Sequence, residues 1–404
     1  MEIMERIHTF YKMKFLSSLT EKDLRNKICL LRVDLNVLEA DRRGFFNNRS
    51  GLTRIPFRIE AVLPTIKFLT GKGAKVVILS HRGRPKPAKQ ANPELRIKNL
   101  EFSLKPFAKI LSSLLKKPVR FMDFKIGKPD FQKSGSVFLL ENLRFFDGEE
   151  KNDEKFAKKL ASLGDIYVND AFSVCHRANA SVAAIVKFLP SYAGLLLEKE
   201  IKNLDKAMKS PKKPLIVILG GAKVSDKIGM IKNFLNRADY FLVGGGMANT
   251  FLAAQGLPVG DSLYEEKMIP SARKFLKSKK IILPIDTAVY KREILDIGPK
   301  TIEKYSKIIE NAGTIIWNGP MGYIEDKKFR KGSEAIAKAI IKNKAFSIIG
   351  GGETTAAFQA ATQINADINA DKRRKNQRLF LSTGGGAMLE YLAGKKLPGL
   401  KVLK

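Results

Sequence analysis

One pattern in the second half of the chain constrains its fold most: a short apolar run followed directly by a cluster of glycines. Glycine lets the backbone take φ > 0 and lets a ligand approach closely, and the residues after each triplet predict the start of a helix. The free N–H groups at a helix start suit phosphate, so strand, glycine turn and helix together predict a nucleotide site. The glycines concerned are Gly220-Gly221, Gly244-Gly245-Gly246, Gly350-Gly351-Gly352 and Gly384-Gly385-Gly386.

Polar side chains, not glycines, mark the ends of the apolar runs in the first half. The turn at residues 80–85 places an imidazole and two guanidiniums after such a run, and guanidinium suits carboxylate or phosphate. We expect this turn to bind an anion, with a solvated turn as the alternative. One half is therefore predicted to hold a nucleotide through its backbone and the other to hold an anion through side chains. The residues at these run ends are Asp34, Asn36, His81, Arg84, Arg144, His176 and Arg177.

Apolar runs alternate with helical patterns along the whole chain. This alternation predicts βαβ units and parallel sheets, whose ligands gather beyond the carboxyl ends of the strands. A charged, helical-looking segment at 195–209, followed by a serine and two prolines, marks a boundary. The sequence thus predicts an α/β fold with two doubly wound parallel-sheet (Rossmann-like) domains joined by a hinge helix. The predicted strands are 28–33, 76–79, 137–140, 166–168, 215–219, 240–243, 281–283, 314–317, 346–349 and 379–381, and the predicted helices include 59–69, 104–115, 154–163, 226–234 and 333–342.

Composition narrows the class of protein. The chain has 404 residues, enough for about two or three domains, and no apolar run reaches the ~18 residues of a membrane helix. Its two cysteines exclude a disulfide framework and its start is not a secretory signal, so we expect a cytoplasmic protein. The formal net charge of +33 leaves nucleic acid open as a secondary partner. The lysines are spread almost everywhere, which favours a solvated basic surface; the one basic cluster, 372–375, lies in a predicted surface loop at 365–378.

Lys223 and Lys227 follow the glycine pair at 220–221. On a helix start, their spacing of four would put both ammonium groups on one face, toward a phosphate; a solvated lysine pair is the alternative. Another strand-end turn, at 317–322, holds the only tryptophan. There is no Walker pattern, no Gly-x-Gly-x-x-Gly after a strand and no zinc spacing of cysteine and histidine, which disfavours P-loop, dehydrogenase and zinc sites.

In their order along the chain, these motifs resemble phosphoglycerate kinase. The resemblance covers nearly the whole chain and rests on residues 32–37, 58–61, 80–85, 141–144, 167–172 with 176–177, 220–227, 244–247, 317–322, 350–354 and 382–387. It implies an N-terminal 3-phosphoglycerate-binding domain at 1–194 with 391–404, an interdomain hinge helix at 195–210 and a C-terminal nucleotide-binding domain at 211–390. The C-terminal segment would pack back on the N-terminal domain.

The resemblance implies reversible phosphoryl transfer between 1,3-bisphosphoglycerate and ADP, giving 3-phosphoglycerate and ATP, with Mg²⁺ and by hinge closure. This is a step of glycolysis and gluconeogenesis, and we expect a monomer without membrane contact. Arg58 and Lys223 match the family residues that stabilise the transferring group. The implied substrate-binding residues are Asp34, Asn36, Arg58, His81, Arg84, Arg144, His176 and Arg177. The implied nucleotide-binding residues are Gly220, Gly221, Lys227, Gly245, Gly246, Asn318, Glu325, Gly351, Gly352, Glu353 and Thr354.

Several positions depart from the family pattern. Glu353 stands where the family generally has aspartate as its Mg²⁺ contact, and one extra methylene still allows it to reach the metal directly or through water. Leu38 replaces a proline, and Arg82 replaces an apolar residue and is expected to add positive potential. The loop near 40–51 and the stretch at 365–378 look altered or longer. Two other hypotheses remain: a nucleic-acid-binding protein, from the charge, and a dinucleotide-dependent dehydrogenase, from the fold class alone.

Overall fold

A computed structural model describes residues 13–37, 56–85, 100–123, 134–362 and 378–403. The chain divides into two compact units: unit 1 is Met1–Lys199 with Lys396–Lys404, and unit 2 is Glu200–Lys395. Leu38, the loop at 40–51 and the basic cluster at 372–375 lie outside the described residues, so the expectations placed on them stay predictions. Among the described residues, none of the helices combines the length and the apolar character needed to cross a bilayer.

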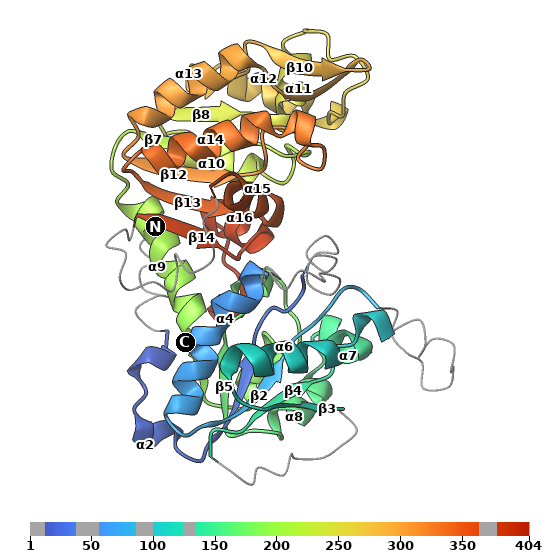
Figure 1. Cartoon of the computed structure of the whole chain (residues 1–404), viewed down its shortest axis with the longest axis vertical. Helices are drawn as coiled ribbons and strands as arrows, with labels where there is room; N and C mark the ends of the chain where they lie inside the picture. Colours follow the sequence, from blue (N-terminus) through green and yellow to red (C-terminus); the bar gives the residue numbers. More distant parts are fainter. Residues whose placement is uncertain (1–12, 38–55, 86–99, 124–133, 363–377, 404) are drawn as a thin grey trace. The chain divides into compact units, whose positions relative to one another are not determined.

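Unit 1 is built on a six-stranded sheet in the order β3-β4-β2-β1-β5-β6 (Figure 1). Every neighbouring pair is parallel, as the alternation of apolar runs and helices predicted. Strands β2, β3 and β4 lie on one side of β1, and β5 and β6 lie on the other side, which makes the gap beyond β1 and β5 the switch point where such sheets bind ligands. The strands are β1 (Ile28–Arg32), β2 (Lys75–Leu79), β3 (Val119–Met122), β4 (Val137–Leu140), β5 (Ile166–Asn169) and β6 (Ser191–Ala193). The sequence analysis did not identify β3 or β6, which are short edge strands.

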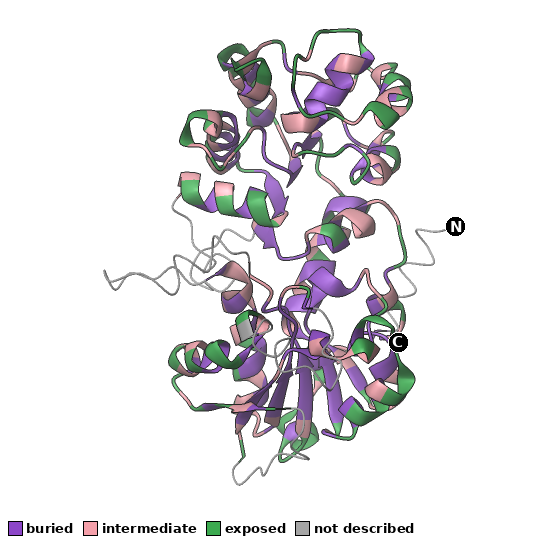
Figure 2. Ribbon diagram, turned by 90° about the vertical axis from the view of Figure 1, so that its right-hand side faces the viewer, coloured by how far each residue is buried: buried purple, intermediate pink, exposed green. Residues whose placement is uncertain are grey.

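Helix α4 of unit 1 packs apolar residues against β2 of this sheet. In α4 the buried residues include Ile59, Val62, Ile66 and Leu69, spaced three or four apart as on one helix face. Figure 2 shows the strands as largely buried, whereas the helices also carry exposed residues. The helical segments are η1 (Leu16–Ser18), α2 (Glu21–Leu24), α4 (Phe57–Gly71), η2 (Leu100–Phe102), α6 (Lys105–Leu115), η3 (Leu143–Phe145), α7 (Asp147–Glu150), α8 (Glu154–Ala161), η4 (Phe172–Val174), η5 (Ala184–Lys187) and α17 (Pro398–Lys401).

Unit 2 has a second six-stranded parallel sheet, in the order β14-β13-β12-β7-β8-β9. Its switch point lies between β7 and β12, and both strands are buried along their whole length. The strands are β7 (Leu215–Leu219), β8 (Tyr240–Val243), β9 (Ile281–Ile282), β12 (Thr314–Asn318), β13 (Phe346–Gly350) and β14 (Leu379–Ser382), and β10 (Thr287–Tyr290) and β11 (Glu293–Ile297) form a separate antiparallel hairpin. Two six-stranded parallel sheets confirm the predicted α/β fold class.

Three helices of unit 2 begin at glycine triplets, as predicted. They are α11 (Gly245–Ala254), α15 (Gly352–Thr362) and α16 (Gly386–Leu392). The other helical segments are α10 (Ile228–Phe234), η6 (Glu266–Met268), α12 (Ile269–Leu276), α13 (Pro299–Glu310), η7 (Lys327–Phe329) and α14 (Lys331–Lys342).

The expectation that Lys223 and Lys227 share one face of a helix is wrong. After Gly221, which takes φ of +79°, the chain runs through turns, and α10 begins only at Ile228. The backbone N–H of Lys227 donates to the carbonyl of Val224 at 2.9 Å, a turn rather than a helical repeat. As a result Lys227 is buried and Lys223 is exposed.

One helix, α9 (Leu195–Lys209), runs from unit 1 into unit 2. Its first turn is held in unit 1, where Asp170 Oδ1 accepts the backbone N–H groups of Leu196 at 2.8 Å and Leu197 at 3.0 Å. Its Glu200 is held in unit 2, where the carboxylate accepts from the Ser382 hydroxyl at 2.7 Å and from the Thr383 backbone N–H at 2.6 Å. The first turn of the helix is therefore attached to the end of β5, and Glu200 in its second turn is attached to the end of β14.

Candidate active site

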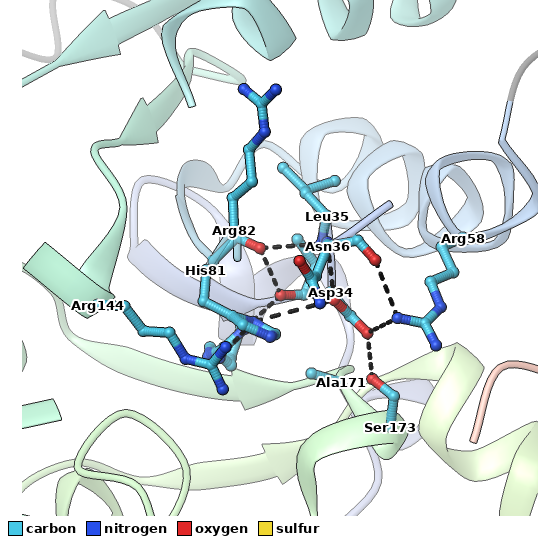
Figure 3. A network of polar contacts seen from close by, with 12 residues as sticks. Asp34, Leu35, Asn36, Arg58, His81, Arg82, Arg144, Ala171 and Ser173 are labelled. Atoms are coloured by element: carbon cyan, nitrogen blue, oxygen red, sulfur yellow. Dashed lines mark hydrogen bonds and ion pairs between the residues drawn. The ribbon is translucent and has the colours of Figure 1, made fainter. Parts of the chain in front are cut away.

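Asp34 lies at the centre of a polar network beyond the carboxyl end of β1 (Figure 3). Arg58, on the first turn of α4, donates to Asp34 Oδ2 at 2.7 Å and to the backbone carbonyl of Asn36 at 3.0 Å. Ser173, after β5, donates to the same carboxylate oxygen, and the backbone N–H of Asn36 donates to Oδ1 at 2.8 Å. Burial alone would raise the pKa of Asp34, but the Arg58 charge and these hydrogen bonds outweigh it and hold the pKa well below the usual value.

His81 follows β2 and is almost completely buried beside Asp34. Its Nδ1 lies 3.2 Å from Nη2 of Arg32 and 3.9 Å from Oδ1 of Asp34. Burial is the largest cause that lowers the pKa of His81 well below 6.5, and Arg32, Arg144 and Arg58 lower it further, while Asp34 opposes them. These causes together favour the neutral form of the imidazole.

Asn142 ties the turn after β2 to the turn after β4. Its Oδ1 accepts from the backbone N–H of Arg82 at 3.2 Å and of Arg144 at 3.1 Å. Arg144 donates to the carbonyl of Gly83 at 2.6 Å and pairs with Glu150 at 3.2 Å. The carbonyl and the carboxylate therefore fix the direction of the Arg144 guanidinium beside His81.

The guanidinium of Arg82 lies outside this network, and the expectation that it adds positive potential stays a prediction. Its guanidinium donates to the carbonyl of Ser103 at 2.7 Å and lies 5.2 Å from the ring centroid of Phe107. Figure 3 shows the side chain leaving the turn in the direction away from Asp34. Because Arg82 is buried against the segment that precedes α6, it fastens that segment to the His81 turn.

The remaining predicted side chains of unit 1 are more open. Arg84 is exposed. Arg177 donates through Nε to Nε2 of the adjacent His176 at 3.1 Å. The Asn36 Oδ1 accepts the backbone N–H of Gly83 at 2.8 Å, which fixes the amide next to the His81 turn.

The glycine turns of unit 2 pack backbone against backbone beyond the ends of β7, β8 and β12. The N–H of Gly221 donates to the carbonyl of Pro320 at 2.7 Å, and the N–H of Gly245 donates to the carbonyl of Met321 at 2.7 Å. A Cβ at Gly220 would lie 2.0 Å from the Pro320 carbonyl oxygen, and a Cβ at Gly245 would lie 2.8 Å from the nitrogen of Gly221. Only glycine fits at these positions, so the turns form a floor of bare backbone.

Asn318 and Thr354 connect this floor to the start of α15. Asn318 donates to the Gly350 carbonyl at 2.9 Å, and Thr354 Oγ1 accepts the Gly319 N–H at 2.7 Å. Gly351 between them takes φ of +99°, which leaves the N-terminal N–H groups of α15 at the end of β13. A helix start of this kind suits phosphate oxygens.

Lys227 is a buried cation of unit 2. A Cβ on Gly221 would lie 3.5 Å from its Nζ, so the ammonium group stands against the glycine floor. Burial lowers the pKa of Lys227, and the carboxylates of Asp226, Glu353 and Glu265 oppose that shift. Lys223 and Glu325 are exposed.

Three residues of the unit 1 network were not predicted as site residues: Arg32, Asn142 and Ser173. Arg32 could have been found, because a charged residue within an otherwise apolar run needs a buried partner. Its partners are the Ser181 hydroxyl at 2.8 Å and Glu149 at 3.9 Å. Nothing in the sequence marks Asn142 or Ser173 as more than ordinary turn residues.

Comparison with known proteins finds one family along nearly the whole chain. The family model for phosphoglycerate kinase matches residues 19–395. The phosphoglycerate kinase of Dictyoglomus turgidum is 44% identical over 421 residues, which cover 97% of this chain and 99% of that protein. The phosphoglycerate kinase of Moorella thermoacetica is 43% identical over 421 residues, covering 96% of this chain and 99% of that protein.

Two solved structures share the fold. The structure of phosphoglycerate kinase from Coxiella burnetii has a TM-score of 0.76 at 37% identity and covers 97% of this chain and 98% of its own. The crystal structure of phosphoglycerate kinase from Pyrococcus horikoshii OT3 has a TM-score of 0.78 at 34% identity. The match covers 97% of this chain and 98% of that one.

Proposed function

The chain belongs to the phosphoglycerate kinase family, and from this premise we propose how its residues transfer a phosphoryl group between 1,3-bisphosphoglycerate and ADP. The observation that carries the proposal is the pair of sites at the two switch points. One is an arginine network around Asp34, and the other is a floor of glycine turns that ends at a helix start. The dehydrogenase hypothesis is wrong, because the family match runs over residues 19–395.

In unit 1, we propose that cationic and polar side chains bind 3-phosphoglycerate. Arg58 stabilises the transferring group, and Asp34 holds Arg58 in place through the 2.7 Å ion pair. The acceptor carboxylate is already ionised at neutral pH, so the reaction needs no general base. The substrate-binding set is Asp34, Asn36, Arg58, His81, Arg84, Arg144, His176 and Arg177.

In unit 2, we propose that the nucleotide lies on the glycine floor with its phosphates at the start of α15. Lys227 neutralises phosphate charge, and Lys223, whose side chain is exposed, reaches the transferring group as Arg58 does. The nucleotide-binding set is Gly220, Gly221, Lys227, Gly245, Gly246, Asn318, Glu325, Gly351, Gly352, Glu353 and Thr354.

The residues around Glu353 fit a magnesium ion that arrives with the nucleotide. Among the described residues there is no cluster of three or more metal-ligating side chains, as a site built wholly from protein would need. Mg²⁺ usually takes one or two carboxylates and completes its shell with substrate phosphates and water. Glu353, exposed on the first turn of α15, supplies one such carboxylate. When bound, the ion would neutralise phosphate charge in the transition state.

We propose that residues 1–194 with 391–404 bind 3-phosphoglycerate, that 211–390 bind the nucleotide and that the helix at 195–210 is the hinge. The attachment of the first turn of α9 to Asp170 in unit 1 and of Glu200 to Ser382 in unit 2 supports this role. Closure would exclude water from the γ-phosphate. We also propose that the protein acts as a monomer in the cytoplasm.

The experiment is a coupled assay of ATP consumption with 3-phosphoglycerate and Mg²⁺. We expect turnover that requires all three components. Folded protein that consumes no ATP under these conditions would contradict the proposed reaction. Replacing Glu353 by aspartate tests the metal contact, since it should shift the Mg²⁺ concentration at half-maximal rate and leave the KM for 3-phosphoglycerate unchanged.

A further inference from the structure

Two arginines of unit 1 each point an N–H group at a histidine ring nitrogen. Nη2 of Arg32 lies 3.2 Å from Nδ1 of His81, and Nε of Arg177 donates to Nε2 of His176 at 3.1 Å. A guanidinium has five N–H donors, has no acceptor and is not deprotonated in proteins. The ring nitrogen that faces it must therefore be the one without a proton.

We propose that the two histidines are neutral and held in opposite tautomers, with the proton of His81 on Nε2 and the proton of His176 on Nδ1. The inference deepens the proposed function and rests on it, because it assigns a hydrogen-bond donor within the proposed substrate site. Arg32 acts as a positioning residue here, since it selects the tautomer without reaching the substrate.

A competing contact exists at His81, and the distances decide against it (Figure 3). Asp34 Oδ1 lies 3.9 Å from Nδ1 and would favour a proton there, whereas Arg32 lies at 3.2 Å. The Asp34 carboxylate is already occupied by Arg58, by Ser173 and by a backbone N–H. A proton on Nδ1 would also point at the Arg32 cation. The contact with Arg32 therefore decides the tautomer and leaves the proton on Nε2.

Arg32 is itself held in place from other directions. Its Nε donates to the Ser181 hydroxyl at 2.8 Å, its Nη1 donates to the Val33 carbonyl, and Glu149 balances its charge at 3.9 Å. Glu149 also accepts the Ser181 N–H at 2.9 Å, which fixes the carboxylate. The guanidinium is only 1% exposed, so it cannot swing away from the ring toward water.

The charged groups that face His81 are Asp34, Arg32, Arg144 and Arg58. Three of the four are cations, and together with burial they favour the neutral ring. Within the described part of the chain, no hydrogen bond reaches Nε2 of His81, so its proton is available to an anionic oxygen of the substrate. The positive charge of this site would then come from arginine alone.

The decisive measurement is ¹⁵N NMR of full-length protein labelled in its histidine rings, without substrate. The chain has three histidines, so replacing His8, His81 and His176 one at a time by glutamine assigns every ring. At pH 7 we expect His81 to carry its proton on Nε2 and His176 on Nδ1. A proton on Nδ1 of His81, or a doubly protonated ring, would overturn the inference. Because this measurement needs no turnover, it separates failure of the inference from failure of the proposed function.

Removing Arg32 tests the cause of the tautomer. In Arg32→Met/Glu149→Gln, Nδ1 is free to take a proton that faces Asp34, so the ¹⁵N signals of His81 should shift from the form protonated on Nε2 toward the form protonated on Nδ1. Glu149→Gln alone is the matched control and should keep the wild-type spectrum. Unchanged His81 signals in the folded double variant would show that Arg32 does not set the tautomer.

A kinetic comparison covers the case in which the double variant does not fold. The amide nitrogen of His81→Gln stands near the position of Nε2, and that of His81→Asn near the position of Nδ1. A lost hydrogen bond to a charged group costs ~1.5–3 kcal/mol, or about 10-fold to 150-fold in affinity. His81→Asn should raise the KM for 3-phosphoglycerate by at least about tenfold and His81→Gln by less than about threefold. Equal losses would refute the assigned donor.

Discussion

Arg58 donates to the buried Asp34 carboxylate and to the Asn36 carbonyl, and in the proposed reaction it also contacts the transferring phosphoryl group. We predict that Arg58→Ala lowers kcat by ~10²-fold or more while KM changes less, as for a contact made mainly in the transition state. Steady-state kinetics for both substrates will measure this, with thermal unfolding as the fold control because Asp34 loses its ion pair. A raised KM with unchanged kcat would show that Arg58 only binds substrate.

Lys223 tests the catalytic role of a cation with less effect on the fold than Arg58, because it is exposed and lies outside any helix. We predict that Lys223→Ala also lowers kcat by ~10²-fold, whereas its free energy of unfolding stays within about 0.5 kcal/mol of wild type. Lys232→Ala, at an exposed lysine of α10, is the matched control and should change neither quantity. If the two variants behave alike, Lys223 has no catalytic role.

At the scale of secondary-structure elements, the start of α9 depends on one buried carboxylate. Asp170 accepts two backbone N–H groups of the first turn, and a Cβ on Gly194 would lie 2.3 Å from its Oδ1. Burial raises the pKa of Asp170 from 3.8 to about 6, although the N–H groups of Leu197 and Leu196 oppose the shift. The helix is thus capped by a group whose ionised form is costly at neutral pH.

The free energy of unfolding depends on pH wherever the folded and unfolded chains bind different numbers of protons. Between pH ~4 and ~6 the folded protein binds the Asp170 proton and the unfolded chain does not, so ionisation lowers the free energy of unfolding as pH rises through that window. Asp170→Asn keeps the acceptor oxygen and removes the ionisation. We predict that it stabilises the protein by about 1–3 kcal/mol at pH 7 and has little effect at pH 4. Urea unfolding at both pH values measures this, and destabilisation at pH 7 would mean that the helix dipole outweighs burial.

At the scale of the whole molecule, the formal net charge of +33 dominates the long-range electrostatic interactions. Like charges repel within the compact state, and raising the salt concentration from ~0.01 M to ~0.1 M shortens the screening length from ~30 Å to ~10 Å. We predict that NaCl raises Tm over this range and lowers kcat/KM for the anionic substrates. A neutral solute at matched osmolality is the control, and sulfate is avoided because it resembles phosphate. A Tm that does not respond to salt would mean that the repulsion is already weak.

Much of the architecture could be read from the sequence. Apolar runs fixed where the inner strands lie, because a strand buried on both faces needs continuous apolar residues, as in Leu215–Leu219. Glycine triplets marked the starts of α11, α15 and α16, since a crowded turn with φ > 0 admits little else. Asp34, Asn36 and His81, at the ends of β1 and β2, lie together because parallel strands end at one edge of a sheet.

Only the tertiary structure decided where the side chains point. Lys223 and Lys227 separate because α10 starts at Ile228, and Arg82 turns away from Asp34 because the Ser103 carbonyl accepts its N–H. Arg32 reaches Ser181, which is 149 residues away in the chain, and only that fixed position sets its contact with His81. Local sequence determines the period of burial and the turns that are sterically allowed. The direction of a polar side chain depends on which distant donor or acceptor the fold brings beside it, and the local pattern does not contain that information.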